Sequence, residues 1–188
     1  MKHLIKKAIA TATLALSASG AFAADTVLTI SSWAPPGHGM NAILWPEFTK
    51  MLEEASEGRM SAEIKYGLAP PPAQFDVVLD GAADITWIFH GYNPGRFVAS
   101  KMIEIPGYDG NAEAASVAYW KAYEKYLAAA NEHDGVKVLA MMTHGPGILQ
   151  SEAKVTSLDQ ISGMKLRLGG GVSGDVGAAL GATGIRVP

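Results

Sequence analysis

The chain of 188 residues contains no cysteine. Without thiols it forms no disulfide and has no thiolate to serve as a nucleophile or metal ligand, so its fold depends on packing alone. Its five histidines, at positions 3, 38, 90, 133 and 144, lack the close spacing typical of metal sites. No pair of acidic residues stands out as a catalytic dyad. We therefore expect no cofactor, no metal ion and no catalytic residues.

The sequence also lacks an apolar run of about 18 residues, the length that a membrane span requires. Its N-terminus instead has the three parts of an export signal. Three lysines precede an apolar run from Ala8 to Leu16, and Ala21–Ala23 provides a small-x-small cleavage site. We predict that residues 1–23 are a signal peptide and that the mature protein is periplasmic and not membrane-embedded. No Arg-Arg pair precedes the apolar run, which argues against export with a preloaded cofactor.

An excess of positive charge is missing as well. Removing the three lysines of residues 1–23 leaves 12 basic against 18 acidic residues, a net charge of about −6. Such a negative charge balance gives no basic patch of the kind that binds nucleic acid. The 165 residues that remain can bury one sizeable core or two small ones.

The first half of the mature chain alternates apolar strand and helix patterns. Val27–Trp33 and Met60–Gly67 read as strands, and apolar residues recur at helical spacing over Ile43–Ala55 between them. Gln74–Asp80 predicts a short helix, and Asp84–Phe89 a third strand. A parallel sheet follows from this order.

Polar and aromatic residues follow two of these strands. In an open parallel sheet, ligands bind beyond the carboxyl ends of the strands. On that rule Trp33 with His38, and Trp87 with His90, converge on one crevice and are candidate ligand-binding residues. The alternatives are core packing for the tryptophans and a solvated loop for the histidines.

Asn111 is placed to cap a helix that runs to about Ala130, and Val136–Met142 reads as a fourth strand. The segment Thr143–Gly147 then interrupts the pattern. We interpret it as a crossover between two lobes, the first formed by residues 24–143 and the second beginning at 144–188.

Gly163–Pro188 reads as a strand, a glycine loop over Gly169–Gly171, and a helix over Val172–Leu180. Arg167 lies near the carboxyl end of the strand, where backbone amides and the positive end of the helix favour an anion. Arginine suits a carboxylate because it donates two parallel hydrogen bonds. Alternatively, Arg167 is a snorkelling edge-strand residue.

The spacing Gly169-x-Gly171-x-x-Gly174 fits the dinucleotide fingerprint, but the acidic residue that completes it would fall beyond Pro188. Ile185–Pro188 reads as a strand just begun. We therefore expect the sequence to be part of a longer protein, cut within its second lobe.

Several segments together resemble the solute-binding proteins of TRAP transporters, of the DctP type. They are the block Ser157–Arg167 (SLDQISGMKLR), the later turn Leu180–Thr183 (LGAT), and the turn Asp80–Ile85 (DGAADI). The resemblance implies an α/β fold, a two-lobed periplasmic binding protein of type II-like architecture with a near-complete first lobe.

The resemblance further implies that Arg167 binds the carboxylate of a small organic acid, which is delivered to TRAP membrane permease subunits. Some acid-binding members carry a second arginine near the position of Gly147, and this chain lacks it. The ligand suggested instead is a carboxylate with a bulky or apolar body, on the basis of Trp33, Trp87 and Gly147. Gly170 of the glycine loop completes the set of candidate ligand-binding residues.

Two other functions remain open at this point. One is an exported α/β nucleotide-binding oxidoreductase that uses the glycine loop. The other is a binding protein that serves an ATP-driven importer or a sensor.

Overall fold

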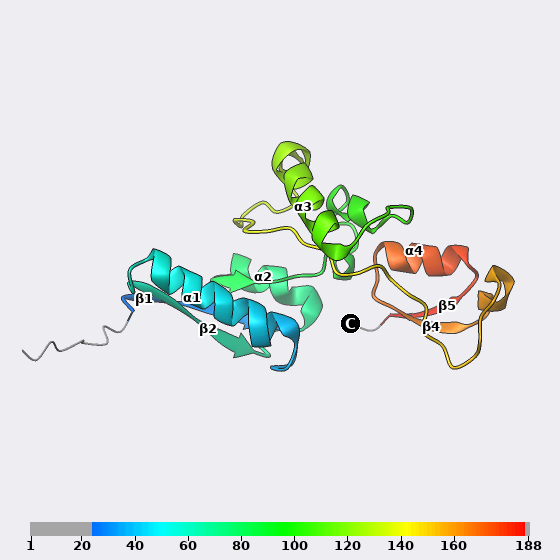
Figure 1. The fold of residues 1–188 in the computed structure, drawn as a ribbon, viewed down its shortest axis with the longest axis horizontal. Helices are drawn as coiled ribbons and strands as arrows, with labels where there is room; N and C mark the ends of the chain where they lie inside the picture. Colours follow the sequence, from blue (N-terminus) through cyan, green and yellow to red (C-terminus); the bar gives the residue numbers. More distant parts are fainter. Residues whose placement is uncertain (1–23, 187–188) are drawn as a thin grey trace, which may run out of the picture.

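A computed structural model describes residues 24–186 as a mixed α/β protein with two separate sheets, which confirms the predicted fold class (Figure 1). A three-stranded sheet and a two-stranded sheet lie toward opposite ends of the long axis in Figure 1. The predicted signal peptide, residues 1–23, lies outside the described residues.

The first sheet is built on a strand-helix-strand unit. β1 (Thr26–Ser32) pairs in parallel with β2 (Met60–Tyr66) along its whole length, and α1 (Trp45–Ala55) connects them. A π-helical turn, Met40–Leu44, leads into α1, and Pro46 lies in the first turn of α1. Proline is tolerated there because a helix has no acceptor for the N–H groups of its first turn. The predicted unit and its parallel pairing are confirmed.

β1 is the central strand because β3 (Ile85–Thr86) pairs with its other edge, giving the order β2-β1-β3. β3 is shorter than the predicted Asp84–Phe89. The core lies between β1 and α1, where Ile30, Trp45 and Ile85 pack together. β1 is buried at its carboxyl end, Ile30–Ser32, where β3 covers its second edge, and it is exposed at Thr26 and Val27.

A buried glutamine ties α2 (Gln74–Leu79) to this sheet. The Gln74 side chain is fully buried, and its Oε1 accepts hydrogen bonds from Ser31 Oγ at 2.7 Å and Thr86 Oγ1 at 2.8 Å. Its Nε2 donates to the carbonyl oxygen of Ala69 at 2.7 Å. Because both the oxygen and the nitrogen of this amide are hydrogen-bonded, the side chain links α2, β1 and β3 at little cost of burial.

The middle of the chain is mostly helical. α3 (Ala112–Ala122) begins at Asn111, whose Oδ1 accepts from Ala114 N at 2.9 Å, and helical turns continue to Ala130. The capped helix predicted over this range is therefore confirmed. The strand predicted at Val136–Met142 is wrong: this segment has no strand partner among the described residues and is extended without pairing. Its apolar pattern alone does not make a strand, because a strand also needs a neighbour to accept its backbone hydrogen bonds.

The second sheet repeats the strand-helix-strand arrangement. β4 (Lys165–Leu168) and β5 (Thr183–Arg186) pair in parallel, and α4 (Val172–Ala179) joins them. The predicted strand, glycine loop and helix are confirmed, although β5 begins two residues before the predicted start at Ile185.

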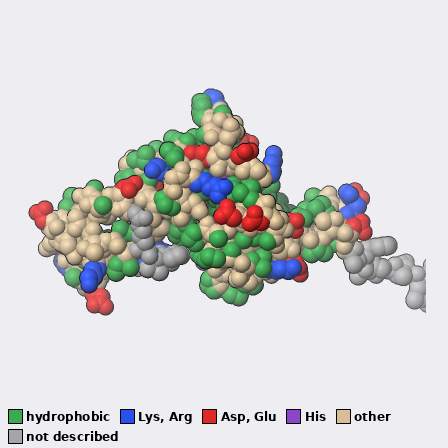
Figure 2. All heavy atoms as spheres, turned by 180° about the vertical axis from the view of Figure 1, so that it is seen from behind, with side chains coloured by type: hydrophobic (Ala, Val, Ile, Leu, Met, Phe, Trp, Pro, Cys, Tyr) green, Lys and Arg blue, Asp and Glu red, His purple; other side chains and the backbone are tan. Residues whose placement is uncertain are grey.

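The surface carries large apolar areas. Figure 2 shows, on one face, charged side chains of both signs scattered between wide areas of apolar side chains. Ile148, in an irregular stretch, is 76% exposed, and Leu158, at the start of the 3₁₀ turn Leu158–Ile161, is 69% exposed. Within residues 24–186, no helix combines the length and the apolar character of a bilayer span.

Candidate functional site

Three predicted side chains meet beyond the carboxyl ends of β1 and β3. The rings of Trp33 and Trp87 stack with centroids 4.3 Å apart, and the His38 ring stacks on Trp87 at 5.4 Å. Parallel pairing of β1 with β3 brings this about, because Ser31 lies opposite Thr86, and the tryptophans follow two residues after Ser31 and one residue after Thr86. The structure thus brings three of the four residues predicted to converge into contact, and their role in ligand binding stays a prediction.

Hydrogen bonding fixes one tryptophan and leaves the other without a partner. Trp87 Nε1 donates to Ser32 Oγ at 3.1 Å, and Ser32 Oγ donates to Asn41 Oδ1 at 2.7 Å. Trp33 Nε1 is buried and has no hydrogen-bond partner among the described residues. A buried donor without an acceptor costs about 1–3 kcal/mol. Trp45 Nε1, in the core of the first sheet, is likewise buried without a partner among the described residues.

Aromatic contacts continue from this cluster toward the second sheet. Tyr92 packs edge-on against Trp33 at 5.9 Å, and Phe89 packs edge-on against Tyr92 at 4.9 Å. The His144 ring lies 6.2 Å from Phe89. We call the series Trp87, Trp33, Tyr92 and Phe89 the aromatic row. It was not predicted as a unit, because its residues are spread over two loops.

Arg167 lies at the end of the aromatic row. It is an exposed residue of β4, and its Nη1 lies 3.8 Å from the position that a Cβ on Gly169 would occupy. Phe89 Cε1 lies 3.7 Å from that same position. The guanidinium and the aromatic ring therefore flank one glycine that has no side chain to separate them. Among residues 24–186, the structure records no ion pair for Arg167.

The glycine loop touches the loop after β3 backbone to backbone. Gly170 is buried with φ +97°, and a Cβ on it would lie 2.6 Å from the Gly91 carbonyl oxygen. A Cβ on Gly171, with φ +56°, would lie 2.9 Å from Gly91 Cα. Real Cβ atoms do not approach this closely, so only glycine fits at both positions. The predicted residue Gly170 thus brings β4 and α4 against the first sheet's loops.

Gly147, another predicted residue, lies elsewhere. It is exposed in the irregular stretch before β4, and no atom lies within 4 Å of its Cβ position. The structure does not bring it into contact with the aromatic row.

His90 packs in a separate buried cluster. Its ring stacks on Phe97 at 4.2 Å, its Nε2 lies 3.1 Å from His133 Nε2, and its Nδ1 lies 3.3 Å from the Tyr119 hydroxyl. Burial first, and then neighbouring His133, lower the pKa of His90 to about 4, while Glu132 opposes the change. No aromatic contact joins this ring to Trp33 or Trp87 among the described residues. His90 therefore stands apart from the other predicted aromatic residues.

The hydrogen-bond directions in this cluster can be assigned. Burial raises the pKa of Tyr119 to about 12, and its hydroxyl donates to the Ser100 carbonyl oxygen at 2.8 Å. The Tyr119 oxygen then accepts from His90 Nδ1–H, which leaves His90 Nε2 to accept from His133 Nε2–H. Burial also lowers the pKa of His133. Both rings are thus neutral and share one hydrogen bond.

A residue that the sequence analysis missed lies at the start of α4. Glu104, from the 3₁₀ turn Ser100–Glu104, accepts a hydrogen bond from Val172 N at 3.4 Å through Oε2. The same oxygen lies 3.0 Å from the Cβ position of Gly171. Burial raises the pKa of Glu104, while the Val172 N–H, His144 and Lys101 lower it. The anion expected at this helix end is therefore a carboxylate of the chain itself, and no sequence motif marks it.

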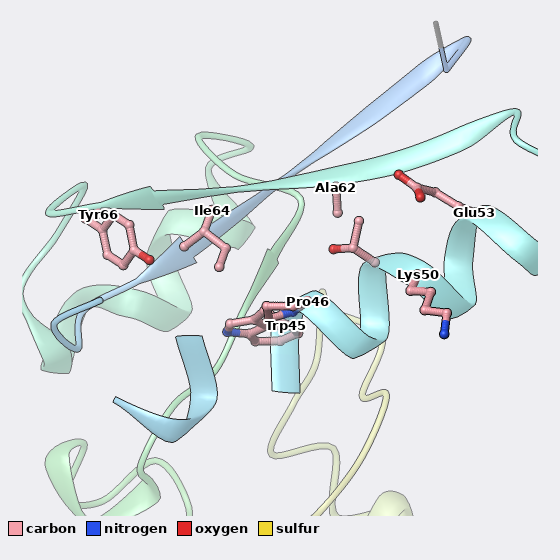
Figure 3. A pocket seen from close by; sticks show the side chains of 8 residues that line it. Trp45, Pro46, Lys50, Glu53, Ala62, Ile64 and Tyr66 are labelled. Carbon is pink, nitrogen blue, oxygen red and sulfur yellow. The ribbon is translucent and has the colours of Figure 1, made fainter. Parts of the chain in front are cut away.

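Two hollows are present near these elements. A hollow of about 170 Å³ lies where the loop after β3 meets the start of α4, and His90, Phe97, Lys101, Gly171 and Asp175 are among its lining residues. A wider open groove of about 400 Å³ lies between α1 and β2, where Ala62 and Ile64 point from the strand toward Trp45 and Pro46 (Figure 3). None of the predicted site residues lines the groove of Figure 3.

Comparisons with known proteins give consistent matches. Residues 30–188 match the family described as bacterial extracellular solute-binding protein, family 7, or DctP. The chain is 38% identical to a TRAP periplasmic solute-binding protein from Bordetella bronchiseptica with bound (R)- and (S)-mandelate, with a TM-score of 0.82. That alignment covers 86% of this chain and 52% of the Bordetella protein.

Two further relatives were compared. A TRAP solute-binding protein from a marine metagenome, specific for aromatic acid ligands and crystallised with 3-hydroxybenzoate, is 32% identical with a TM-score of 0.79, over 86% of this chain and 51% of that one. The outer membrane transporter protein TsaT of Comamonas testosteroni is 27% identical over 168 residues, 88% of this chain and 50% of TsaT. This chain spans about half the length of each of these three proteins.

Proposed function

Because the chain belongs to family 7 of the bacterial extracellular solute-binding proteins, the DctP family, we propose that it captures a small aromatic carboxylate in the periplasm. In this proposal the loaded protein delivers its ligand to the permease subunits of a TRAP transporter. The family and the compared relatives are solute-binding receptors and not enzymes, which supports a binding role.

The observation that carries the proposal is the placement of Arg167 at the end of the aromatic row. Its guanidinium has no ion pair among the described residues, so its donors are available to a carboxylate from outside. Phe89 Cε1 and Arg167 Nη1 both lie beside the Cβ position of Gly169, so the ring of an aromatic acid bound to the guanidinium would lie close to the Phe89 ring. Edge-to-face and stacked aromatic pairs contribute about 0.5–1.5 kcal/mol beyond the area that they bury. The mandelate and 3-hydroxybenzoate in the two related structures are ligands of this class.

The nucleotide-binding alternative is disfavoured by the same loop. A dinucleotide site needs the helix N-terminus and the glycine backbone open to a pyrophosphate. Here Glu104 contacts the first amide of α4, and Gly91 packs on Gly170 and Gly171. The TRAP proteins among the relatives likewise favour a TRAP permease over an ATP-driven importer or a sensor.

The proposal is tested by removing the guanidinium. Arg167→Ala should weaken binding of 3-hydroxybenzoate and mandelate by about 100-fold or more, since a carboxylate bound without its partner loses about 3–5 kcal/mol. Isothermal titration calorimetry on the intact protein measures this directly. Arg59→Ala is the matched control, because Arg59 is exposed at the amino end of β2, away from the carboxyl ends of the strands. Unchanged affinity in Arg167→Ala would remove Arg167 from the site.

A further inference from the structure

Two opposite charges flank the glycine loop. The Arg167 Nη1 atom lies against Gly169, and the Glu104 Oε2 atom lies against Gly171, two residues further on. Two residues span at most about 7 Å of extended chain. The proposed carboxylate-binding group of β4 and a carboxylate from the turn Ser100–Glu104 therefore lie beside the same short loop.

Glu104 takes the position that a second anion of the ligand would otherwise favour. The first amides of a helix and its positive end attract negative charge, and in α4 the Val172 N–H donates to Glu104. An incoming carboxylate gains nothing at this helix end while Glu104 is present. It would also meet the negative charge of Glu104 itself.

The positive groups near Glu104 do not cancel this charge by direct pairing. Lys101 and His144 lie close enough to lower the pKa of Glu104. Among residues 24–186, however, neither forms an ion pair with it within 4.0 Å. Tyr119, which also faces Glu104, is neutral because its pKa is about 12.

From this arrangement we propose that Glu104 sets the charge specificity of the site, admitting monocarboxylates and rejecting acids with a second carboxylate. The proposal rests on the proposed function, since it requires the first carboxylate to be bound by Arg167. Glu104 acts here by repulsion and not by contact with the accepted ligand.

The size of the effect follows from Coulomb's law. For a second ligand carboxylate held about 8 Å from Glu104, the repulsion changes affinity between about 2-fold and 30-fold, for effective dielectric constants between about 80 and 20. The half-buried position of Glu104 favours the middle of this range. We expect about 10-fold discrimination from this residue.

The experiment compares two ligands of nearly the same shape. In 3-hydroxybenzoate the ring carries one carboxylate and one hydroxyl, and in isophthalate a second carboxylate replaces the hydroxyl. Calorimetry measures both affinities for the wild-type protein and for Glu104→Gln. Glutamine keeps an acceptor oxygen for the Val172 N–H and removes only the charge. We expect the preference for 3-hydroxybenzoate over isophthalate to fall by about 10-fold in Glu104→Gln.

A matched control separates this local effect from the change in net charge. Glu113→Gln removes one negative charge from an exposed position on α3 and should leave the preference unchanged. Glu104→Asp keeps the charge and should retain the preference, which excludes a purely structural role. A change below about 2-fold in Glu104→Gln, or no measurable isophthalate binding to it, would overturn the proposal.

The two proposals fail in different ways. Binding of 3-hydroxybenzoate that depends on Arg167, together with an unchanged preference in Glu104→Gln, would reject Glu104 alone. Binding of 3-hydroxybenzoate that does not depend on Arg167, or no binding to the wild-type protein, would reject both the proposed function and the inference that rests on it.

Discussion

A pair of histidines, His133 buried and His90 partly buried, makes the fold sensitive to mild acid. His90 and His133 share a single hydrogen bond between their Nε2 atoms at 3.1 Å, which requires one lone pair and therefore one unprotonated ring. Burial and His133 lower the pKa of His90 from 6.5 to about 4 in the folded protein. In the unfolded chain its pKa is close to 6.5.

The sign of the effect follows from these two values. Above about pH 6.5 the His90 ring is neutral in both states, and its contribution to stability is fully present. As the pH falls from about 6.5 toward 4, the unfolded chain takes up a proton that the folded protein does not, so the free energy of unfolding falls. One pKa unit corresponds to about 1.4 kcal/mol, so His90 alone costs about 2–3 kcal/mol by pH 4.5. The positive charge of Arg96 lowers the pKa of His133, whereas the negative charge of Glu132 raises it.

Urea unfolding at about pH 7.5 and about pH 4.5 measures this loss. His90→Asn is the comparison, because asparagine does not titrate and keeps a nitrogen donor near Tyr119. The variant should be less stable than the wild-type protein at the higher pH, since it loses the stacking on Phe97. Between the two pH values it should lose about 2–3 kcal/mol less than the wild type.

Other acid-sensitive groups do not obscure the comparison. Hydrogen bonds from Ser100 and Ala99 lower the pKa of Glu132, which also makes the fold weaker at low pH. That contribution is present in both proteins and cancels in the difference. If the wild type and His90→Asn lost the same free energy within about 0.5 kcal/mol, the assignment of neutral histidines would be refuted.

Two further predictions concern stability. Gly170→Ala should destabilise the protein by about 2–4 kcal/mol in urea unfolding, because its φ is +97° and the new Cβ would lie 2.6 Å from the Gly91 carbonyl oxygen. Gly147→Ala, at an exposed position with open space, should stay within about 0.5 kcal/mol, and an equal loss in both would contradict the backbone contact. Gln74→Ala should cost about 2–4 kcal/mol, because it leaves the buried Ser31 hydroxyl without its acceptor. The exposed Gln150→Ala is its control, and a loss below about 1 kcal/mol in Gln74→Ala would show that the buried network does not stabilise the fold.

The parts of the fold that could be predicted are those whose partners are close in sequence. Strand, helix and parallel strand follow one another in both sheets, and the rule for parallel strands was enough to bring Trp33, His38 and Trp87 together. The strand prediction for Val136–Met142 failed because these residues match a strand pattern but have no neighbouring strand in the described structure.

The parts of the candidate site that escaped prediction depend on contacts between distant residues. The His90 ring meets His133, 43 residues later, and the Glu104 carboxylate meets Val172, 68 residues later. Neither pairing leaves a spacing or motif in the sequence. Burial and partner identity decide both roles, and these are known only once the chain has folded.

The contact between Gly91 and Gly170 has a mechanical consequence. Two stretches of main chain meet there with no side chains between them, so the glycines contribute no interlocking side chains to this contact. This contact fixes the closest approach of the two parts, because main chain cannot move nearer to main chain. We expect the glycine loop to serve as the pivot if the angle between the two sheets changes on ligand binding.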